Sequence, residues 1–402
     1  MSPSQRRWLV LTRALVSCLP AIGPVARLGA QGTSGGATSD VRAGWQYGIG
    51  VGGEWNSNLQ LAPSGAADGL TTARLRAEGS RIWETRRDRV ALTAGGALIR
   101  VPERPEFNRE SYDVGVSGLR RFSRRASASA AARAQQELTN RAITSFGDGA
   151  LLPGYLIARS QEGSSNIAYA LSTRTTAAAA VGAQRVWIEG GQVSRGQRAT
   201  AAATISHRQS RRTTVGAQLG YQRSELDSIA IRIPDVTGRL EHQLAERLSV
   251  NLIAGASRLA SGQQDAATFL TGASSIRYRS AEGDVALNAQ RTVGQEFGRQ
   301  TAAAQITNGV SLILSRRLGI GWRLSGDLTQ QWSQSTAADR ATVRSTIGSL
   351  LAGYAMRSGP RFDVTAFAAR RSAAFRSQAY GVSAGVTYSW ASLQQQSASG
   401  GR

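Results

Sequence analysis

Residues 380–390 read YGVSAGVTYSW, and they alternate between two kinds of side chain. Tyr, Val, Ala and Trp occupy the even-numbered positions, whereas Gly, Ser and Thr occupy the odd-numbered ones. Successive side chains of a strand point to opposite faces, so this period of two predicts a β-strand with one apolar face. An apolar face of this kind has to lie against a protein core or a lipid bilayer.

The same alternation recurs along the chain outside the N-terminal segment. It is clear at residues 45–55, 214–222 and 320–329, and weaker at several other segments. The alanine-rich residues 126–134 and 177–183 are exceptions, because taken alone they are also compatible with helix. The many alternating segments favour an all-β protein, and the scarcity of Leu, Ile and Phe clusters argues against a soluble sandwich.

Short polar turns separate the alternating segments at steps of about 36 residues, a spacing that helical repeats of about 34 residues share. The alternation with a period of two favours strands over helical repeats. The turns lie near Arg87, Arg124, Arg174, Arg211, Glu246, Glu282, Arg316 and Gly359.

Longer irregular segments are expected between these turns. They are residues 56–69, 101–110, 139–165, 224–234, 259–268 and 333–340. A tight turn followed by a long loop, repeated along the chain, is typical of a transmembrane up-and-down antiparallel β-barrel. Eight hairpins and two flanking strands predict about 18 strands, with 16 as the alternative, and both termini on the side of the tight turns.

Composition excludes several other classes of protein. The 402 residues include 48 basic and 26 acidic ones, for a formal net charge of +22, and every basic residue apart from the two histidines is Arg. The arginines occur singly or in pairs rather than in blocks, which argues against a nucleic-acid partner. A single Cys excludes a disulfide within the chain. No run of about 18 apolar residues follows the N-terminal segment, so membrane-spanning helices are not expected there.

The first 30 residues are interpreted as a cleaved export signal. Arg6 and Arg7 precede a mostly apolar stretch, and Ala30 supplies the small residue before the expected cleavage ahead of Gln31. A lipidated Cys18 and an uncleaved helix remain alternatives. The expected organisation is a signal at 1–30, a periplasmic segment at 31–40, a barrel at 41–390 and a periplasmic tail at 391–402.

The alternating strand at 380–390, which ends in an aromatic residue, resembles the assembly signal of bacterial outer-membrane β-barrels. The arginine-containing turns at 122–125, 210–212 and 314–318 resemble the periplasmic turns of porin-like barrels. The resemblance implies the outer membrane of a Gram-negative-type bacterium, with outer-membrane lipid and the barrel-assembly machinery as partners.

Polar and charged side chains occupy the face opposite the apolar one, and we expect them to line the lumen. A barrel of about 16 to 18 strands leaves an aqueous channel unless a plug fills it. The pattern therefore predicts a passive channel for small polar or anionic solutes, although the arginines could instead pair with acids and stiffen the wall. The candidate pore-lining residues are Arg74, Arg76, Glu78, Arg239, Glu241, Arg277, Arg279, Arg323 and Asp327.

Residues 139–165 form the longest predicted loop, which either constricts the pore or lies on the surface. Enzymatic activity is not expected, because His207 and His242 lie near strand ends without a recognisable nucleophile pattern. No cofactor or metal site is predicted. An export-associated or structural barrel of a secretion or surface-polysaccharide system remains the alternative function. The sequence alone does not separate that alternative from a passive channel.

Overall fold

The computed structural model describes residues 44–57, 69–138, 157–189, 195–226, 229–261, 264–294, 304–336, 342–356, 359–372 and 376–393. Within these ranges the chain forms eighteen β-strands and one short 3-10 helix, η1 (Pro105–Phe107). The strands are β1 (Gly44–Asn56), β2 (Leu70–Glu84), β3 (Asp88–Arg100), β4 (Arg109–Arg121), β5 (Ala126–Leu138), β6 (Ile157–Ala170), β7 (Thr175–Glu189), β8 (Arg195–Arg208), β9 (Thr213–Leu226), β10 (Ile229–Ala245), β11 (Leu248–Ser261), β12 (Gln264–Arg279), β13 (Gly283–Gly294), β14 (Gln305–Arg317), β15 (Trp322–Ser335), β16 (Thr342–Ala355), β17 (Arg361–Ser372) and β18 (Arg376–Leu393).

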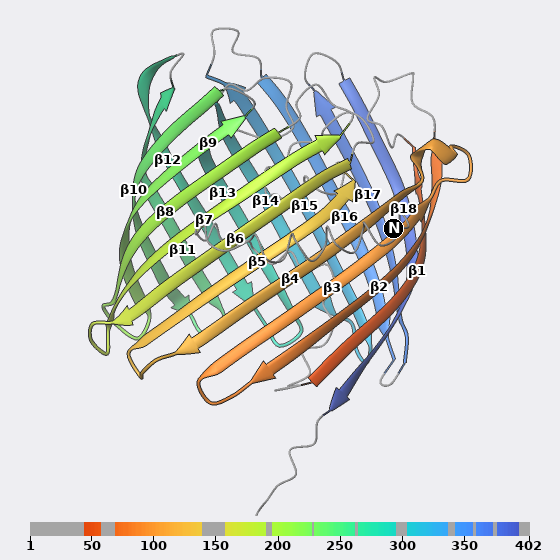
Figure 1. Cartoon of the computed structure of the whole chain (residues 1–402), viewed down its shortest axis with the longest axis horizontal. Helices are drawn as coiled ribbons and strands as arrows, with labels where there is room; N and C mark the ends of the chain where they lie inside the picture. The colour runs from red at the N-terminus through yellow and green to blue at the C-terminus, as the bar shows by residue number, and fades with distance from the viewer. Residues whose placement is uncertain are drawn as a thin grey trace, which may run out of the picture.

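The strands form one antiparallel sheet that closes on itself (Figure 1). Each strand pairs with its sequence neighbours, and β1 pairs with both β2 and β18 over its full length. Closure leaves no free sheet edge, which is the condition for a sheet to cross a lipid bilayer. The prediction of an antiparallel barrel of 18 strands is confirmed.

All eight predicted tight turns lie at one end of the barrel, the end where β1 begins and β18 finishes (Figure 1). The first residue of β1, Gly44, pairs with the last residue of β18, Leu393. The connections at the opposite end include the longer ones. We call the first end periplasmic and the opposite end extracellular, following the arrangement of outer-membrane barrels.

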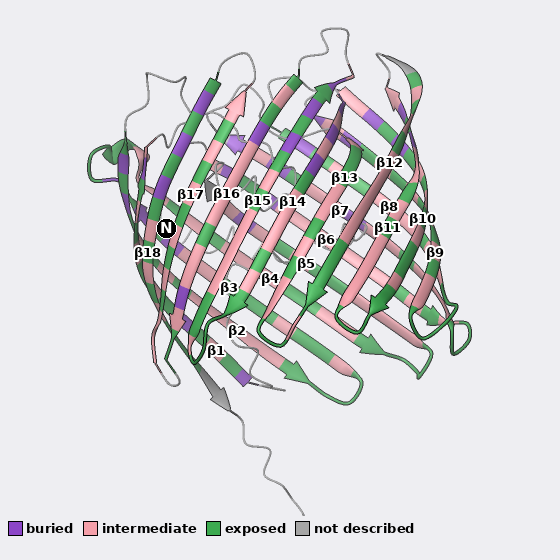
Figure 2. Ribbon diagram, turned by 180° about the vertical axis from the view of Figure 1, so that it is seen from behind, coloured by how far each residue is buried: buried purple, intermediate pink, exposed green. Residues whose placement is uncertain are grey.

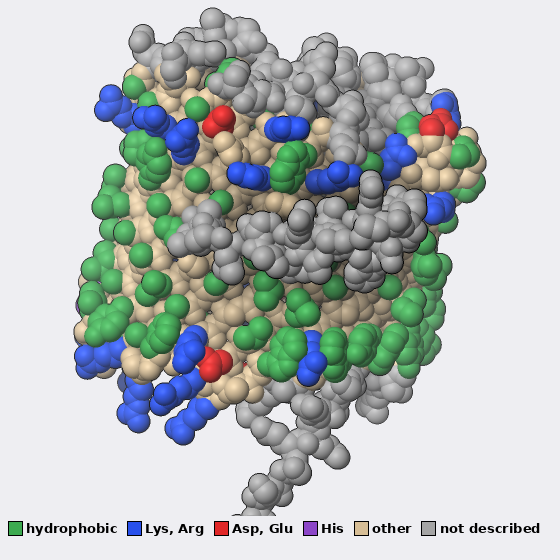
Figure 3. Space-filling view, viewed as in Figure 1, with side chains coloured by type: hydrophobic (Ala, Val, Ile, Leu, Met, Phe, Trp, Pro, Cys, Tyr) green, Lys and Arg blue, Asp and Glu red, His purple; other side chains and the backbone are tan. Residues whose placement is uncertain are grey.

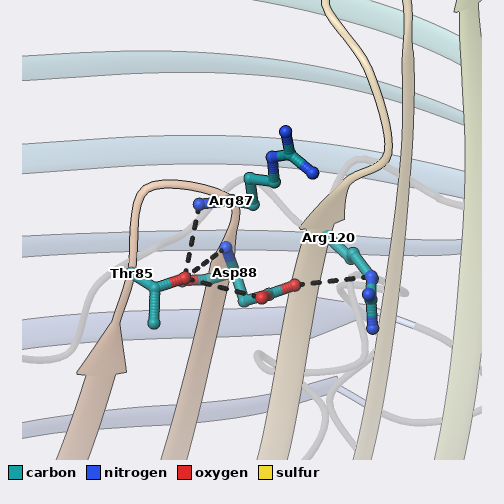
Figure 4. A network of polar contacts seen from close by, with 4 residues as sticks. All are labelled: Thr85, Arg87, Asp88 and Arg120. Atoms are coloured by element: carbon teal, nitrogen blue, oxygen red, sulfur yellow. Dashed lines mark hydrogen bonds and ion pairs between the residues drawn. The ribbon is translucent and has the colours of Figure 1, made fainter.

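Hydroxyl side chains shape the periplasmic turns. In the β2–β3 turn the Thr85 hydroxyl accepts hydrogen bonds from the backbone N–H groups of Arg87 (3.3 Å) and Asp88 (2.9 Å), and the Asp88 carboxylate reaches Arg120 at 3.6 Å (Figure 4). Ser123, Ser172 and Ser210 accept the same two backbone bonds in their own turns, at 3.0 to 3.1 Å. A hydroxyl that satisfies two turn amides favours a short, fixed connection.

Parts of three predicted irregular segments, 139–165, 224–234 and 259–268, turn out to be strands. Residues 157–165 belong to β6, so the predicted loop ends at 156, and residues 139–156 lie outside the described residues. The segment 224–234 is taken up by the ends of β9 and β10, and 259–268 by the ends of β11 and β12, apart from two residues in each. Both alanine-rich segments are also strands, within β5 and β7.

Pro234 explains why the 224–234 segment reads as a loop. It lies inside β10, opposite Tyr221 of β9, and the pairing of β10 with β11 skips Ile233 and Pro234. Proline lacks an amide hydrogen, so one ladder bond is lost, but the strand continues on both sides.

Residues towards the extracellular ends of the strands are more often buried than those towards the periplasmic ends (Figure 2). Many inward side chains at the extracellular ends are buried, including Ser224, Ser333 and Ser377, which are at most 1% exposed. Inward residues nearer the periplasmic end, such as Arg279 and Arg323, are exposed. Inward side chains of the described strands are therefore more buried at the extracellular end than at the periplasmic end.

The described strands run from Gly44 to Leu393, close to the expected barrel limits of 41 and 390. The expected signal, the segment 31–40 and most of the tail lie outside the described residues. Among the helices in the described ranges, none is long and apolar enough to span a membrane.

Candidate functional site

The lumen wall consists of the side chains opposite the exposed apolar phase. On β1, Tyr47, Ile49 and Val51 are exposed and face outward, while Gln46 and Glu54 lie on the other face. Residues paired across an antiparallel ladder share a face, so the register extends this assignment from strand to strand around the barrel.

The register places all nine candidate pore-lining residues on the inward face. They come from four strands: Arg74, Arg76 and Glu78 from β2, Arg239 and Glu241 from β10, Arg277 and Arg279 from β12, and Arg323 and Asp327 from β15. Contact of these side chains with a permeating solute stays a prediction.

Several luminal arginines form ion pairs with carboxylates. Arg76 lies 2.7 Å from Glu78, and Arg239 lies 3.0 Å from Glu241. Arg239 also donates to the Asn251 side chain at 3.2 Å. Pairing of this kind cancels much of the field that these arginines would otherwise project into the lumen.

The inward side chains near the periplasmic ends of β12 and β13 carry an excess of positive charge, while Glu282 in the turn between them pairs with Arg316 at 3.4 Å. Arg277 forms an ion pair with Asp284, and Arg279 lies directly opposite the same residue in the register. Two guanidinium groups thus share one carboxylate near the periplasmic mouth, which leaves about one unit of positive charge there.

The neighbouring β14–β15 hairpin adds a second basic element. Arg317 and Arg323 lie directly opposite each other in the register, on the inward face. Both side chains are exposed, and neither has a hydrogen bond or ion pair with another side chain within the described part of the chain. We refer to Arg279, Arg317 and Arg323 as the mouth arginines.

Sequence reasoning missed several luminal charges. Arg133 pairs with Asp113 at 2.5 Å, and Glu162 lies opposite Arg133 on the next strand. Arg361 pairs with Asp363 at 2.8 Å. Glu162 lies in a segment interpreted as loop, and Arg133 in the alanine-rich β5, where the outward residues are too small to reveal the phase. The cross-strand register identifies their face.

The two histidines lie on the outward face near the periplasmic end. The ring Nδ1 of His207 is 2.9 Å from the Thr175 hydroxyl, and that of His242 is 2.9 Å from the Thr213 hydroxyl. Each is a cross-strand Thr–His contact directed away from the lumen. Within the described residues no group of three or more His, Cys, Asp or Glu side chains is placed to hold a metal ion.

The outer wall has the features of a membrane-facing surface. Figure 3 shows hydrophobic side chains over the wall, between a row of arginines towards one end and a second group of arginines at the other. Tryptophans face outward near both ends, as amphipathic rings do at bilayer boundaries: Trp45, Trp83, Trp322 and Trp390 at the periplasmic end, and Trp55, Trp187 and Trp332 at the extracellular end.

Comparison with known proteins gives similarity of fold alone. No family model matches the chain, and no curated protein matches it. Solved structures that match include OccK2 (OpdF) from Pseudomonas aeruginosa, at 12% identity and a TM-score of 0.50, covering 87% of this chain and 98% of that chain. A structure of the same protein in complex with glucuronate matches at 11% identity and a TM-score of 0.49, with the same coverage.

The outer membrane protein opdK from Pseudomonas aeruginosa also matches, at 14% identity and a TM-score of 0.48, covering 87% of this chain and 99% of that chain. The likeness to OccK2 is one of fold, and the chain itself folds as a closed barrel of 18 antiparallel strands.

Proposed function

We propose that this barrel is a passive outer-membrane channel for small polar solutes, with a weak preference for anions. The observation that carries the proposal is the polar inner wall of a closed barrel of 18 strands, a size at which side chains do not fill the lumen. The outer wall provides the lipid-facing surface that such a channel needs.

The expected anion preference comes from a few residues. Arg76, Arg239 and Arg277 are paired with carboxylates, so their charge is largely compensated. The mouth arginines, Arg279, Arg317 and Arg323, supply the excess positive charge at the periplasmic mouth. Anions gain there from electrostatic attraction, but fixed charges are screened over about 8 Å at physiological salt, so the preference is modest.

Liposome swelling tests the channel proposal. Vesicles that contain the refolded barrel should swell in isosmotic solutions of small sugars, because water follows the permeating solute. The rate should fall as the solute becomes larger and should be higher for a small carboxylate than for a neutral solute of equal size. Protein-free vesicles are the control. Equal rates with and without the protein would contradict passive permeation.

A second candidate function is supported by burial at the extracellular end. Inward residues of several strands there, such as Leu226, Ile231 and Ser333, are at most 1% exposed. Burial of inward side chains at one end also suits an export-associated channel whose opening depends on a partner. Such a barrel would remain impermeable to small sugars in the swelling assay until the partner is added.

The outer-membrane location carries its own prediction for the N-terminus. If residues 1–30 are a cleaved signal, mass spectrometry of outer-membrane fractions should find a mature chain that begins near Gln31. The barrel-assembly machinery is the proposed partner for insertion, and it would engage the terminal strand. A diacylated chain that begins at Cys18 would contradict cleavage near Ala30.

A further inference from the structure

We propose that a group of outward-facing arginines at the extracellular ends of β6 to β11 binds the phosphate groups of an anionic lipid in the outer leaflet. This inference rests on the proposed outer-membrane location and is independent of conductance. We call the group the extracellular arginine sector. It comprises Arg159, Arg185, Arg195, Arg223, Arg232 and Arg258, and all six are exposed.

The register places these arginines side by side on the outer surface. Arg159 of β6 pairs with Trp187 of β7, and Trp187 pairs in turn with Arg195 of β8. In the register the outward-facing Trp187 therefore lies between Arg159 and Arg195, and the Arg159 side chain donates a hydrogen bond to Gln136 of β5 at 2.8 Å. Tryptophan at this position is typical of the boundary between the hydrocarbon region and the headgroups.

Two members of the sector repel each other in the bare protein. Arg223 of β9 lies directly opposite Arg232 of β10, and like charges directly opposite across a ladder are destabilising. Compensation by protein is slight: the Glu225 carboxylate is 4.0 Å from Arg223 and also accepts a hydrogen bond from Gln197. On these six strands Glu225 is the only acid among the outward side chains that the structure describes at this end.

The outward residues on the membrane side of the sector indicate which class of anionic ligand fits it. On β9 the next outward residues towards the membrane are Tyr221 and Leu219, which are 43% and 62% exposed. A ligand that fits both regions has a phosphate group at the level of the arginines and acyl chains below it. Guanidinium groups bind phosphate oxygens in bidentate geometry, so a phosphorylated lipid satisfies the sector better than a zwitterionic one.

Lipid binding by the purified full-length barrel tests the proposal. The probe is bisphosphorylated lipid A in phosphatidylcholine vesicles, with pure phosphatidylcholine vesicles and inorganic phosphate as comparison arms. The test variant combines Arg185→Gln, Arg223→Gln and Arg232→Gln. Each surface arginine near an anionic headgroup contributes roughly a fivefold factor in binding, so the triple variant should bind lipid A on the order of 100-fold more weakly.

The matched control removes three arginines from periplasmic turns: Arg124→Gln, Arg174→Gln and Arg211→Gln. This control has the same net charge as the test variant and should bind lipid A as the wild type does. The single change Arg232→Gln gives an independent readout, because it relieves repulsion. It should leave stability in neutral detergent unchanged or raise it, and it should reduce the stabilisation that added lipid A provides.

Three results would overturn the proposal. The first is an equal loss of lipid A binding in the test and control triple variants. The second is wild-type binding of phosphatidylcholine vesicles as strong as binding of lipid A vesicles. The third is stabilisation of the barrel by inorganic phosphate alone that equals the stabilisation by lipid A. The first would point to net charge, the second to apolar contact and the third to a free anion as the ligand.

Discussion

Replacing Arg317 and Arg323 by glutamate should convert the weak anion preference of the channel into a cation preference. The two side chains face each other across the β14–β15 ladder at the periplasmic mouth, without a carboxylate partner among the described residues. Reversing both charges should change the energy of a passing monovalent ion by about 1 kcal/mol, or about fivefold in the permeability ratio. The reversal potential of a planar bilayer under a salt gradient measures this ratio.

Two controls distinguish a luminal effect from a general charge effect. Arg124→Glu with Arg211→Glu makes the same change in net charge at turns of the same rim, and it should leave the reversal potential near the wild-type value. The paired change Arg239→Gln with Glu241→Gln removes an ion pair without changing net charge, and it should also have little effect. A shift in the turn variant equal to that in Arg317→Glu, Arg323→Glu would contradict the assignment of the mouth arginines.

Gly255→Ala should destabilise the barrel strongly. Gly255 lies on the inward face of β11 opposite Thr237 of β10, and the two backbones approach closely there. A Cβ at this position would lie 2.0 Å from the Val236 carbonyl oxygen and 2.7 Å from the Thr237 Cα. Both atoms belong to backbone, so the strands have to separate, at a cost of about 1–3 kcal/mol or more. Urea unfolding of the refolded barrel measures the loss.

Gly238→Ala is the matched control for this prediction. Gly238 lies on β10, one residue from Thr237, at a position of the outward face. A Cβ added at Gly238 would lie 3.8 Å from the Ala254 carbonyl oxygen. That distance is an ordinary van der Waals contact. The control should unfold at the wild-type urea concentration or slightly above it, since alanine restricts the unfolded chain more than glycine. Equal destabilisation of the two variants would contradict the close approach at Gly255.

The strands with large outward residues could be predicted from sequence because their two faces differ in kind. In β1 and β18, Trp, Tyr, Val and Ile alternate with Gly, Ser and Thr, so period and phase are both visible. In β5 the outward residues are mostly alanine, and in β7 alanine lies on both faces over residues 177–183; alanine fits either face and either type of secondary structure. The phase of such strands is determined by pairing with their neighbours, which a single sequence does not reveal.

The strand ends at the extracellular side were the least predictable part of the fold. Ile231, Ile233 and Leu259 face inward and form an apolar cluster with Ala304. Apolar residues on the inward phase, next to outward arginines such as Arg232, remove the contrast that marks a barrel strand. Long-range packing fixes this region, and the sequence pattern there favoured loops.

The sequence predicted that a polar face lines the lumen, but not which of its charged side chains form ion pairs. The alternation predicted an inward face for some arginines, such as Arg239 and Arg323, but missed Arg133 and Arg361. Ion pairing depends on the register between strands, which joins Arg277 to Asp284 but leaves Arg317 opposite Arg323. A register shift of two residues would exchange these relations without changing which side chains face the lumen. The distinction between compensated and uncompensated arginines therefore requires the structure.

Single-channel recording of the purified wild-type barrel in a planar bilayer tests the proposed function most directly. The channel account predicts discrete, stable conductance steps, with a reversal potential under a salt gradient that indicates weak anion preference and approaches zero as ionic strength rises. A correctly folded barrel that inserts into the bilayer but shows no conductance steps would contradict the account. That result would identify the barrel as closed in isolation and favour the export-associated function.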